Sequence, residues 1–281
     1  MNIVGLGTAG CNIAQCFSKY PQYKIFLIDT EEREGNLLKV ERHKNIEDYE
    51  ANVPSIKDFV SDSGDDIMLI VGGSGSLSAM SLAILGQIKE KNITVVYIQP
   101  KLSSLTGKKK LLERATFGIL QQYARSGLFK DMYLINNQNI VEIAGQLPVI
   151  GYHDKINEII CSSIHFINVL QNTDYIYGNI EPKEDVCAIS TIGLLDVETS
   201  EETLFFDLDL IREKDYMYTF NRTRLLESSN IIPQIEAKME KKTEDWLTKI
   251  SYRLYSTDYD SDFGYCVFRT SKVQGETIDS L

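Results

Sequence analysis

Two glycine-rich loops near the start of the chain carry residue types that bind phosphate groups. Each loop follows an apolar run that is typical of a buried strand and precedes a segment that is typical of a helix. Glycine lets backbone N–H groups approach an anion closely, and a helix N-terminus favours negative charge. Two such loops in one open α/β sheet predict a nucleotide whose phosphates are bound from two sides. The loops are Gly5-Leu6-Gly7-Thr8-Ala9-Gly10-Cys11-Asn12 and Gly72-Gly73-Ser74-Gly75-Ser76.

The first loop by itself fits a second kind of site. Gly5-x-Gly7-x-x-Gly10 followed by Asp29 matches the dinucleotide-binding fingerprint, in which an acidic residue about 20 positions further on binds the ribose. The second loop favours a nucleoside triphosphate, because its serines add hydroxyl donors for phosphates that one helix end cannot satisfy. A NAD(P)-binding oxidoreductase stays open as an alternative, and a tight strand-to-helix turn is the purely structural interpretation. The GxxxxGK[ST] pattern of P-loop NTPases is absent from the sequence.

Composition excludes several classes of function. The 281 residues, 43% of them apolar, allow one large domain or two modest ones. No stretch approaches 18 consecutive apolar residues, and no basic segment leads into an apolar one at the N-terminus, so neither a membrane span nor a secretory signal is expected. Five cysteines without a CxxC pair argue against a zinc site and fit a reducing, cytoplasmic location. The net charge of −11 disfavours direct nucleic-acid binding.

The elements that must position the loops alternate regularly in the first half of the chain, which predicts a doubly wound parallel α/β sheet. Strands are expected at 2–7, 24–28, 66–71, 93–98 and 132–135, and helices at 11–19, 54–62, 77–90 and 107–126. The segment 31–53 is polar without a regular element, and His43 within it is expected to be solvated.

A long helix at 153–172 follows, and the pattern then becomes that of a smaller α+β domain. Long strands are expected at 203–220 and 251–270, with a helix at 233–249 between them. The predicted organisation is a nucleotide-binding domain at 1–150, a linker helix at 151–176 and a C-terminal domain at 177–281.

Several motifs, taken in order, resemble the tubulin/FtsZ superfamily. The first loop is similar to that family's first glycine loop, and Val71–Ser76 resembles its signature GGGT-G-[ST]-G. Leu105–Lys110 is similar to the FtsZ stretch FEGKKR, and Asp131–Asn137 resembles the strand that ends in an asparagine contacting guanine. Tyr152–Asn157 resembles the segment that completes the base pocket. The resemblance covers essentially the whole chain and is to a divergent, phage- or plasmid-type tubulin-like GTPase.

The resemblance implies GTP or GDP as the ligand, with Mg²⁺ accompanying the triphosphate and no metal site made by protein ligands alone. Departures from the family pattern are Leu77 in place of the last signature glycine, and Ala51–Pro54 in place of the loop that senses the γ-phosphate. Thr106 and Lys110 stand where FtsZ has a glutamate and an arginine. The implied nucleotide-binding residues are Gly7, Thr8, Ala9, Gly10, Cys11, Asn12, Asp29, Gly72, Gly73, Ser74, Gly75, Ser76, Thr106, Lys110, Asn137, Tyr152 and Asn157.

The family's synergy loop, N-x-D-x-x-D in FtsZ, corresponds here to Asn179, Glu181 and Glu184. In the family this loop enters the nucleotide pocket of the next subunit, where its carboxylates position or polarise the attacking water. The resemblance therefore implies an assembly-dependent, slow GTPase that forms a head-to-tail homopolymer. Two interpretations stay open beside it, a solvated acidic turn and a structural family member without turnover. An adaptor or cargo as a further partner is also left open.

Overall fold

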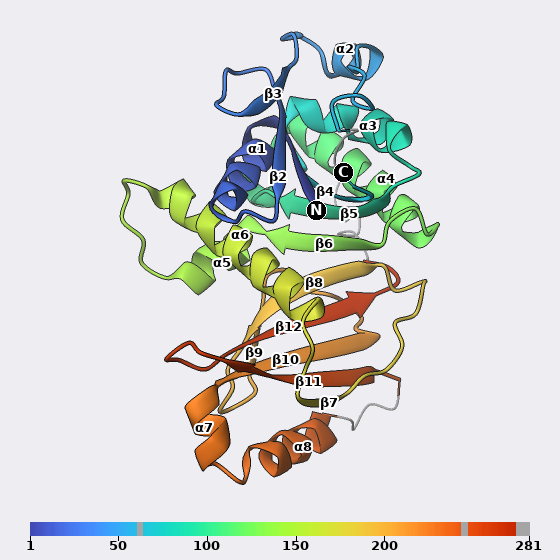
Figure 1. Cartoon of the computed structure of the whole chain (residues 1–281). Helices are drawn as coiled ribbons and strands as arrows, with labels where there is room; N and C mark the ends of the chain where they lie inside the picture. Colours follow the sequence, from blue (N-terminus) through green and yellow to red (C-terminus); the bar gives the residue numbers. More distant parts are fainter. Residues whose placement is uncertain (61–63, 243–246, 274–281) are drawn as a thin grey trace. The chain divides into compact units, whose positions relative to one another are not determined.

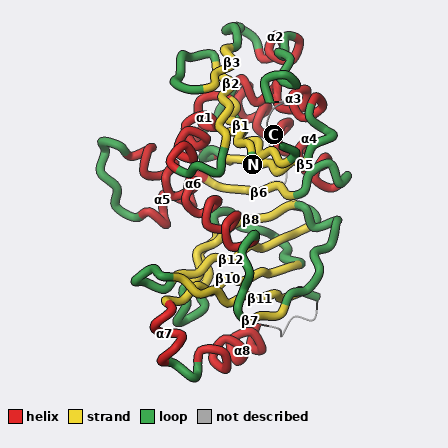
Figure 2. The backbone as a smooth tube through the Cα atoms, viewed as in Figure 1, coloured by secondary structure: helices red, strands yellow, loops and turns green. Residues whose placement is uncertain are grey.

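The computed structural model describes residues 1–60, 64–242 and 247–273 of the chain. Its contacts divide the chain into two compact units, Met1–Ser162 and Ser163–Leu281, whose elements are labelled in Figure 1. Figure 2 shows helices and strands alternating in the first unit and strands forming most of the second. The predicted mixed α/β fold, with a parallel-sheet part followed by an α+β part, is confirmed.

The first unit is built on the strands β1 (Asn2–Leu6), β2 (Lys24–Asp29), β3 (Asn36–Lys39), β4 (Asp66–Gly72), β5 (Asn92–Gln99) and β6 (Asp131–Asn136). They lie in the order β3-β2-β1-β4-β5-β6, and these neighbours pair in parallel. Consecutive residues of β1, β4 and β5 are buried, so both faces of the sheet are covered. Leu6 is level with Ile28 of β2 and with Val71 of β4. The segments after these strands therefore emerge at one edge of the sheet.

Helices connect these strands, as the alternating pattern predicts, except that β2 and β3 are joined by residues 30–35 without a helix. Buried positions in one of them, 107–125, recur at Leu112, Thr116 and Leu120, so one helical face packs inward. Among the described residues, none of the helices is long and apolar enough to span a bilayer. The helices of the first unit are α1 (Gly7–Cys16), η1 (Phe17–Lys19), α2 (Ile46–Ala51), η2 (Ser76–Met80), α3 (Ser81–Gln87), η3 (Leu102–Ser104), α4 (Gly107–Arg125), α5 (Asn137–Ala144) and α6 (Tyr152–Gln171), within which the boundary between the units falls.

The expectations for residues 31–62 are wrong. The segment that was expected to be irregular contains β3 and α2. The helix expected from Pro54 does not form over residues 54–60, and residues 61 and 62 lie outside the described part of the chain. The side chain of Gln87 holds this segment, because its Nε2 donates to the Pro54 carbonyl (2.9 Å) and its Oε1 accepts from the Ile56 N–H (2.8 Å). A contact with a distant helix thus overrides the local preference.

The second unit contains the strands β7 (Tyr177–Asn179), β8 (Ile189–Leu195), β9 (Glu202–Leu204), β10 (Glu213–Asn221), β11 (Lys249–Thr257) and β12 (Phe263–Thr270) and the helices α7 (Arg222–Glu227) and α8 (Ile231–Lys242). The order is β8-β12-β10-β11-β7, with β9 beside β8; β10 and β11 pair in parallel, and the other neighbours are antiparallel. Each of the two long strands expected from the sequence is therefore divided into two.

One face of this second sheet is covered by α8. Ile231, Ile235 and Met239, spaced four residues apart, pack against strand residues that include Tyr216 and Leu254. The helix expected at 233–249 begins two residues earlier, and its last expected residue, Lys249, instead opens β11. Residues 243–246 of that expectation lie outside the described residues.

Candidate nucleotide-binding site

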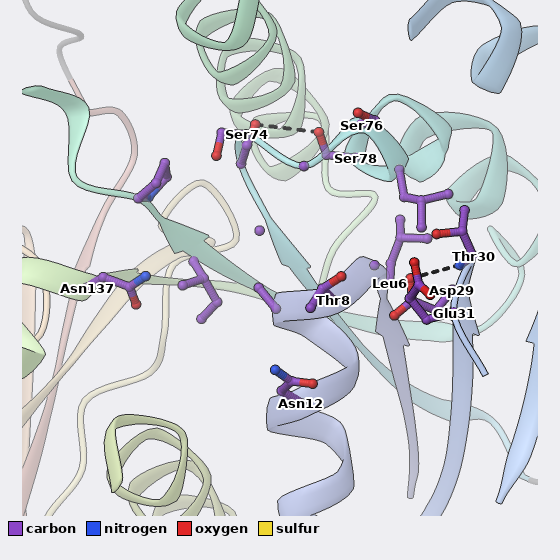
Figure 3. Close-up of a pocket in the computed structure, with 18 of the residues that line it drawn as sticks. Leu6, Thr8, Asn12, Asp29, Thr30, Glu31, Ser74, Ser76, Ser78 and Asn137 are labelled. Carbon is purple, nitrogen blue, oxygen red and sulfur yellow. Dashed lines mark hydrogen bonds between the residues drawn. The ribbon is translucent and has the colours of Figure 1, made fainter. Parts of the chain in front are cut away.

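A cavity of about 820 Å³ opens at the edge of the first sheet where β1, β2 and β4 end (Figure 3). All of its lining residues lie between Leu6 and Asn157, so the cavity belongs to the first unit. The two glycine loops, the end of β2 and the starts of α5 and α6 contribute to its wall. The parallel register of the sheet is what brings these separate segments of sequence together.

The first glycine loop presents the N-terminus of α1 to the cavity. Gly7 has φ +69°, a conformation that favours glycine, and with Thr8 and Ala9 it lines the cavity. Gly10 has a packing function, because a Cβ there would lie 2.2 Å from the Ile70 carbonyl oxygen. Cys11 is buried, and its Sγ donates to the Gly5 carbonyl (3.2 Å). Gly10 and Cys11 therefore hold α1 against the sheet and are not lining residues.

The second glycine loop lies across the cavity and leads into η2. A Cβ on Gly73 would lie 2.0 Å from the Tyr97 hydroxyl oxygen, so this glycine is required by packing. Gly75 differs, because its φ of −75° suits any residue and the nearest atom to an added Cβ is 4.0 Å away. Nothing within the described protein explains a glycine at this position. A glycine on the cavity wall that the fold does not need indicates space kept for a ligand.

The N-terminal residues of α1 and of the five-residue 3₁₀ helix η2 line the cavity, and at the start of η2 the Ser78 N–H already donates to the Gly75 carbonyl (2.8 Å). Neither α1 nor η2 has a side-chain cap or an acidic residue in its first turn, as far as the described residues show. The first N–H groups of a helix have no partner within it, and the helix dipole makes this end positive. Ser74 and Ser76 line the same wall, and Figure 3 shows Thr8 on the opposing segment. Such a wall suits an anion with many acceptor oxygens, such as a polyphosphate.

The other end of the cavity carries amide and aromatic side chains. Asn136 caps α5, since its Oδ1 accepts from the Gln138 N–H (2.8 Å), and its Nδ2 donates to Gln99 (2.9 Å). Asn137 is thereby left to line the cavity, together with Asn157 one turn into α6. The rings of Tyr152 and His153, 5.3 Å apart, line this end as well. A planar heterocycle with donors and acceptors on its edges fits these groups.

Asp29 closes the side of the cavity at the end of β2. Its carboxylate is 1% exposed; Oδ1 accepts from the Thr30 N–H (2.8 Å) and Oδ2 from Nε of Arg33 (2.6 Å). Both oxygens are therefore engaged by the protein itself. A ribose-binding acid of a dinucleotide site needs acceptors directed at the ligand, so this geometry does not favour the oxidoreductase alternative.

Residues of the polar segment 31–49 also line the cavity, although no sequence motif predicts them there. Glu31 and Arg42 line it as an ion pair, and the ring of His43 meets that of Tyr49 with centroids 5.0 Å apart. His43 is half-buried beside the cavity, where it was expected to be solvated. No local pattern marks these residues, because their position depends on β3 and α2, which return the chain to the sheet edge.

The structure brings most of the predicted nucleotide-binding residues together. Thr106, which precedes α4, and Lys110, which is exposed on that helix, do not line the cavity. The segment Ala51–Pro54 does not line it either. The predicted residues on the cavity wall are Gly7, Thr8, Ala9, Asn12, Asp29, Gly72, Gly73, Ser74, Gly75, Ser76, Asn137, Tyr152 and Asn157.

The predicted catalytic loop lies in the second unit. Asn179 ends β7, and the Glu181 N–H donates to Ser251 Oγ (2.9 Å), which fixes the backbone while the side chain is exposed. Glu184 pairs with Lys249 (Oε1–Nζ 2.8 Å), and the hydrogen bond from this lysine lowers the pKa of the Glu184 carboxyl. Within the described residues the Glu181 carboxylate has no ion-pair partner. Glu181 is therefore the more available of the two carboxylates.

Glu184, Cys187 and Glu213 place their ligand atoms within 4.8 Å of one another, an arrangement that can bind a metal ion. Protein partners already occupy this group, since Lys249 pairs with Glu184 and the Glu184 N–H donates to Glu213 (2.7 Å). Burial, reinforced by Glu213, raises the pKa of the Cys187 thiol to about 11, so the thiol is protonated at neutral pH. These groups are satisfied without a metal ion.

Comparison with known proteins identifies the fold. No protein-family model matches the sequence, and no curated protein matches it. An empty FtsZ dimer from M. jannaschii matches with a TM-score of 0.67 at 13% identity, covering 100% of this chain and 93% of the FtsZ chain. CetZ from Methanosaeta thermophila matches with a TM-score of 0.69 at 14% identity, covering 97% of this chain and 86% of the CetZ chain. TubZ from Bacillus thuringiensis serovar israelensis, in GDP-form protofilaments, matches with a TM-score of 0.69 at 12% identity, covering 95% of this chain and 86% of the TubZ chain. The chain has the tubulin/FtsZ-like fold that its motifs predicted.

Proposed function

We propose that this chain is a tubulin-like cytoskeletal protein of the cytoplasm that binds and hydrolyses GTP and polymerises head to tail. The observation that carries the proposal is the pair of uncapped helix N-termini on one cavity, beside a glycine that the fold itself does not need. The cavity volume of about 820 Å³ is within the range of cofactor sites. Tubulin/FtsZ-like chains crystallised as protofilaments, such as TubZ, support the filament part of the proposal.

The chemistry of the wall fits GTP with Mg²⁺. Backbone N–H groups of α1 and η2, with Ser74 and Ser76, would bind the phosphates, and Asn137, Asn157 and Tyr152 would bind guanine. The lining carboxylates of Asp29 and Glu31 each pair with an arginine, so Mg²⁺ would be held mainly by phosphate oxygens and water. When bound, the ion would neutralise the charge that develops on the phosphates.

Hydrolysis, in this proposal, is completed by the loop Asn179–Glu184 of the neighbouring subunit. The exposed Glu181 carboxylate can accept a hydrogen bond and a proton from water, and Glu184 keeps its carboxylate ionised through Lys249. Asn179 adds an amide that can orient the same water. Because each active site then needs two copies of the chain, hydrolysis depends on assembly.

The first expected result concerns nucleotide identity. GTP and GDP should bind at least about tenfold more tightly than ATP or NAD, because the Asn137 and Asn157 amides can both donate to and accept from guanine. Nucleotide extracted from the purified protein and separated by chromatography checks this, with competition assays as the second measurement. Recovery of NAD, or equal competition by ATP and GTP, contradicts the proposal.

The second expected result concerns assembly. A head-to-tail contact joins two different surfaces, so it propagates along a filament unless it closes into a ring. One proposed contact surface surrounds the nucleotide cavity and the other contains the loop Asn179–Glu184, and exposed apolar side chains lie near both. Val149 and Ile150, just before α6, are 93% and 92% exposed. Ile180 and Val186, which flank Glu181 and Glu184, are 44% and 57% exposed. Phosphate release per molecule should rise with protein concentration above a threshold, together with light scattering. A constant specific activity without scattering would indicate a monomeric enzyme.

A second candidate function is a tubulin-like structural protein that binds nucleotide without turning it over. The ion pair between Glu184 and Lys249 favours it, because it occupies one of the two carboxylates of the loop. In that case the extracted nucleotide would be guanine-based and filaments would form, but phosphate release would stay at the rate of free GTP.

A further inference from the structure

Arg33, which no sequence motif singled out, links the end of β2 to α1 beside the cavity. Its Nε donates to Asp29 Oδ2 (2.6 Å), and its Nη1 donates to both Asn12 Oδ1 (2.8 Å) and Gln15 Oε1 (2.9 Å). Its Nη2 lies 3.4 Å from the Thr8 carbonyl oxygen. The side chain is 10% exposed, so these contacts hold the guanidinium in one place. Bonds from every guanidinium nitrogen make Arg33 a rigid neighbour of the cavity wall.

Asn12 lines the cavity and Arg33 does not, so Arg33 would act on a bound ligand through its hydrogen bond to Asn12. A guanidinium has donors and no acceptor, so Asn12 must face it with Oδ1. In Figure 3 the Asn12 amide nitrogen accordingly lies on the side of Asn137 and the oxygen on the side of Asp29. At about 1.5 Å rise per residue, Asn12, the last residue of the first glycine loop, lies about 6 Å along α1 from Thr8. The N–H₂ group is thus a donor directed toward the amide-lined end of the cavity.

We propose that Arg33 is a positioning residue that sets the base preference of the site by fixing the Asn12 amide with its donor toward the cavity. This inference rests on the proposed guanine-nucleotide function. Guanine presents two neighbouring acceptors, N7 and O6, whereas adenine has a donor, N6–H₂, in place of O6. A fixed N–H₂ group is satisfied by O6 and is opposed by the adenine donor. Without Arg33 the amide can turn over and present its oxygen to adenine.

The test is the ratio of GDP to ADP affinity, measured by calorimetry on the full chain. Arg33→Ala should lower this ratio about tenfold, the effect of one hydrogen bond gained or lost. Asn12→Ala should lower it similarly, and Arg33→Ala should have no further effect in the Asn12→Ala background, because both changes remove the same contact. Lys39→Ala is the matched charge control, since Lys39 pairs with Glu32 near the surface and does not line the cavity. The ratio of GDP to ADP affinity in this variant should equal that of the wild type.

Removing Arg33 alone leaves the buried Asp29 carboxylate without its cation, which can unfold the protein. The variant Asp29→Asn/Arg33→Ala removes both charges and should show the same loss of preference. A wild-type GDP preference that survives in both Arg33 variants overturns this inference and leaves the proposed function standing. A further fall of the ratio in the Asn12→Ala background also overturns it, because Arg33 would then act without the amide. A wild type that binds no guanine nucleotide defeats the proposed function and this inference together.

Discussion

Gly75→Val should abolish nucleotide binding while leaving the chain folded. An added Cβ at Gly75 has 4.0 Å to its nearest protein atom and an ordinary φ of −75°, so the fold accommodates valine. The added methyl groups would occupy the space in which we expect the phosphates. Loss of two hydrogen bonds to a charged phosphate, at about 1.5–3 kcal/mol each, corresponds to a fall of at least about 100-fold in affinity. Calorimetric titration with GDP, with circular dichroism of the same sample, measures both expectations.

The matched control is Gly10→Ala, also in a glycine loop. Its Cβ would lie 2.2 Å from the Ile70 carbonyl oxygen of β4, so α1 must move away from the sheet. Overpacking of this kind costs about 1–3 kcal/mol or more, and the thermal unfolding temperature should fall clearly below that of the wild type and of Gly75→Val. A Gly75→Val protein that binds GDP as tightly as the wild type would show that the second loop is only a turn.

Glu181→Ala should lower GTP hydrolysis by about 10²–10⁴-fold with near-normal GTP binding, since it removes a water-positioning carboxylate and leaves the cavity intact. Filaments should persist, because GTP is not consumed. Glu184→Ala should also lower the rate, by a smaller factor, because Glu184 is already paired with Lys249. Phosphate release and sedimentation of assembled protein, measured at the same concentrations, separate hydrolysis from assembly.

Asp185→Ala is the matched control for these variants, because Asp185 is an exposed acid one residue beyond the family spacing. A mixture of Glu181→Ala with Gly75→Val gives a further check, since each variant keeps the half of the active site that the other lacks. Partial recovery of hydrolysis in the mixture is expected if the two halves meet between subunits. Wild-type turnover in Glu181→Ala and Glu184→Ala alike would show that this loop is not catalytic.

Much of the first unit is predictable because its central strands contain runs of consecutive apolar residues. The runs that became β1, β4, β5 and β6 are recognisable without any tertiary information, and those of β1 and β4 are followed by residues typical of a helix start. The helix α5, which follows β6, was not expected from the sequence. The glycine loops could be placed at one sheet edge for the same reason, since parallel strands end together. The second unit was harder to predict at the break between β9 and β10, because residues 206–210 alternate apolar and acidic side chains as a strand does. The break between β11 and β12 falls in the polar residues 258–262, which are typical of a turn, although one strand was expected over 251–270.

The rest of the site depends on contacts between distant residues. Arg33, Arg42 and His43 stand in a polar segment without helical or strand periodicity, so their position beside the cavity could not be read locally. Gly10 and Gly75 show the same limit in another way: both belong to glycine motifs, but only the neighbours of each glycine distinguish packing from ligand space. The family motifs predict which glycines lie in these loops, but not whether a given glycine is needed for packing or for a ligand.

The short edge strands β3 in the first unit and β7 in the second disfavour aggregation of the protein through its strand edges. β3 has 4 residues and β7 has 3, and each pairs with one neighbour, β2 and β11 respectively. A long unpaired strand edge recruits other chains through backbone hydrogen bonds and leads to amyloid-like aggregates, and very short edge strands suppress this. Short edge strands of this kind leave association between copies of the chain to side-chain surfaces, whose contacts can be reversed.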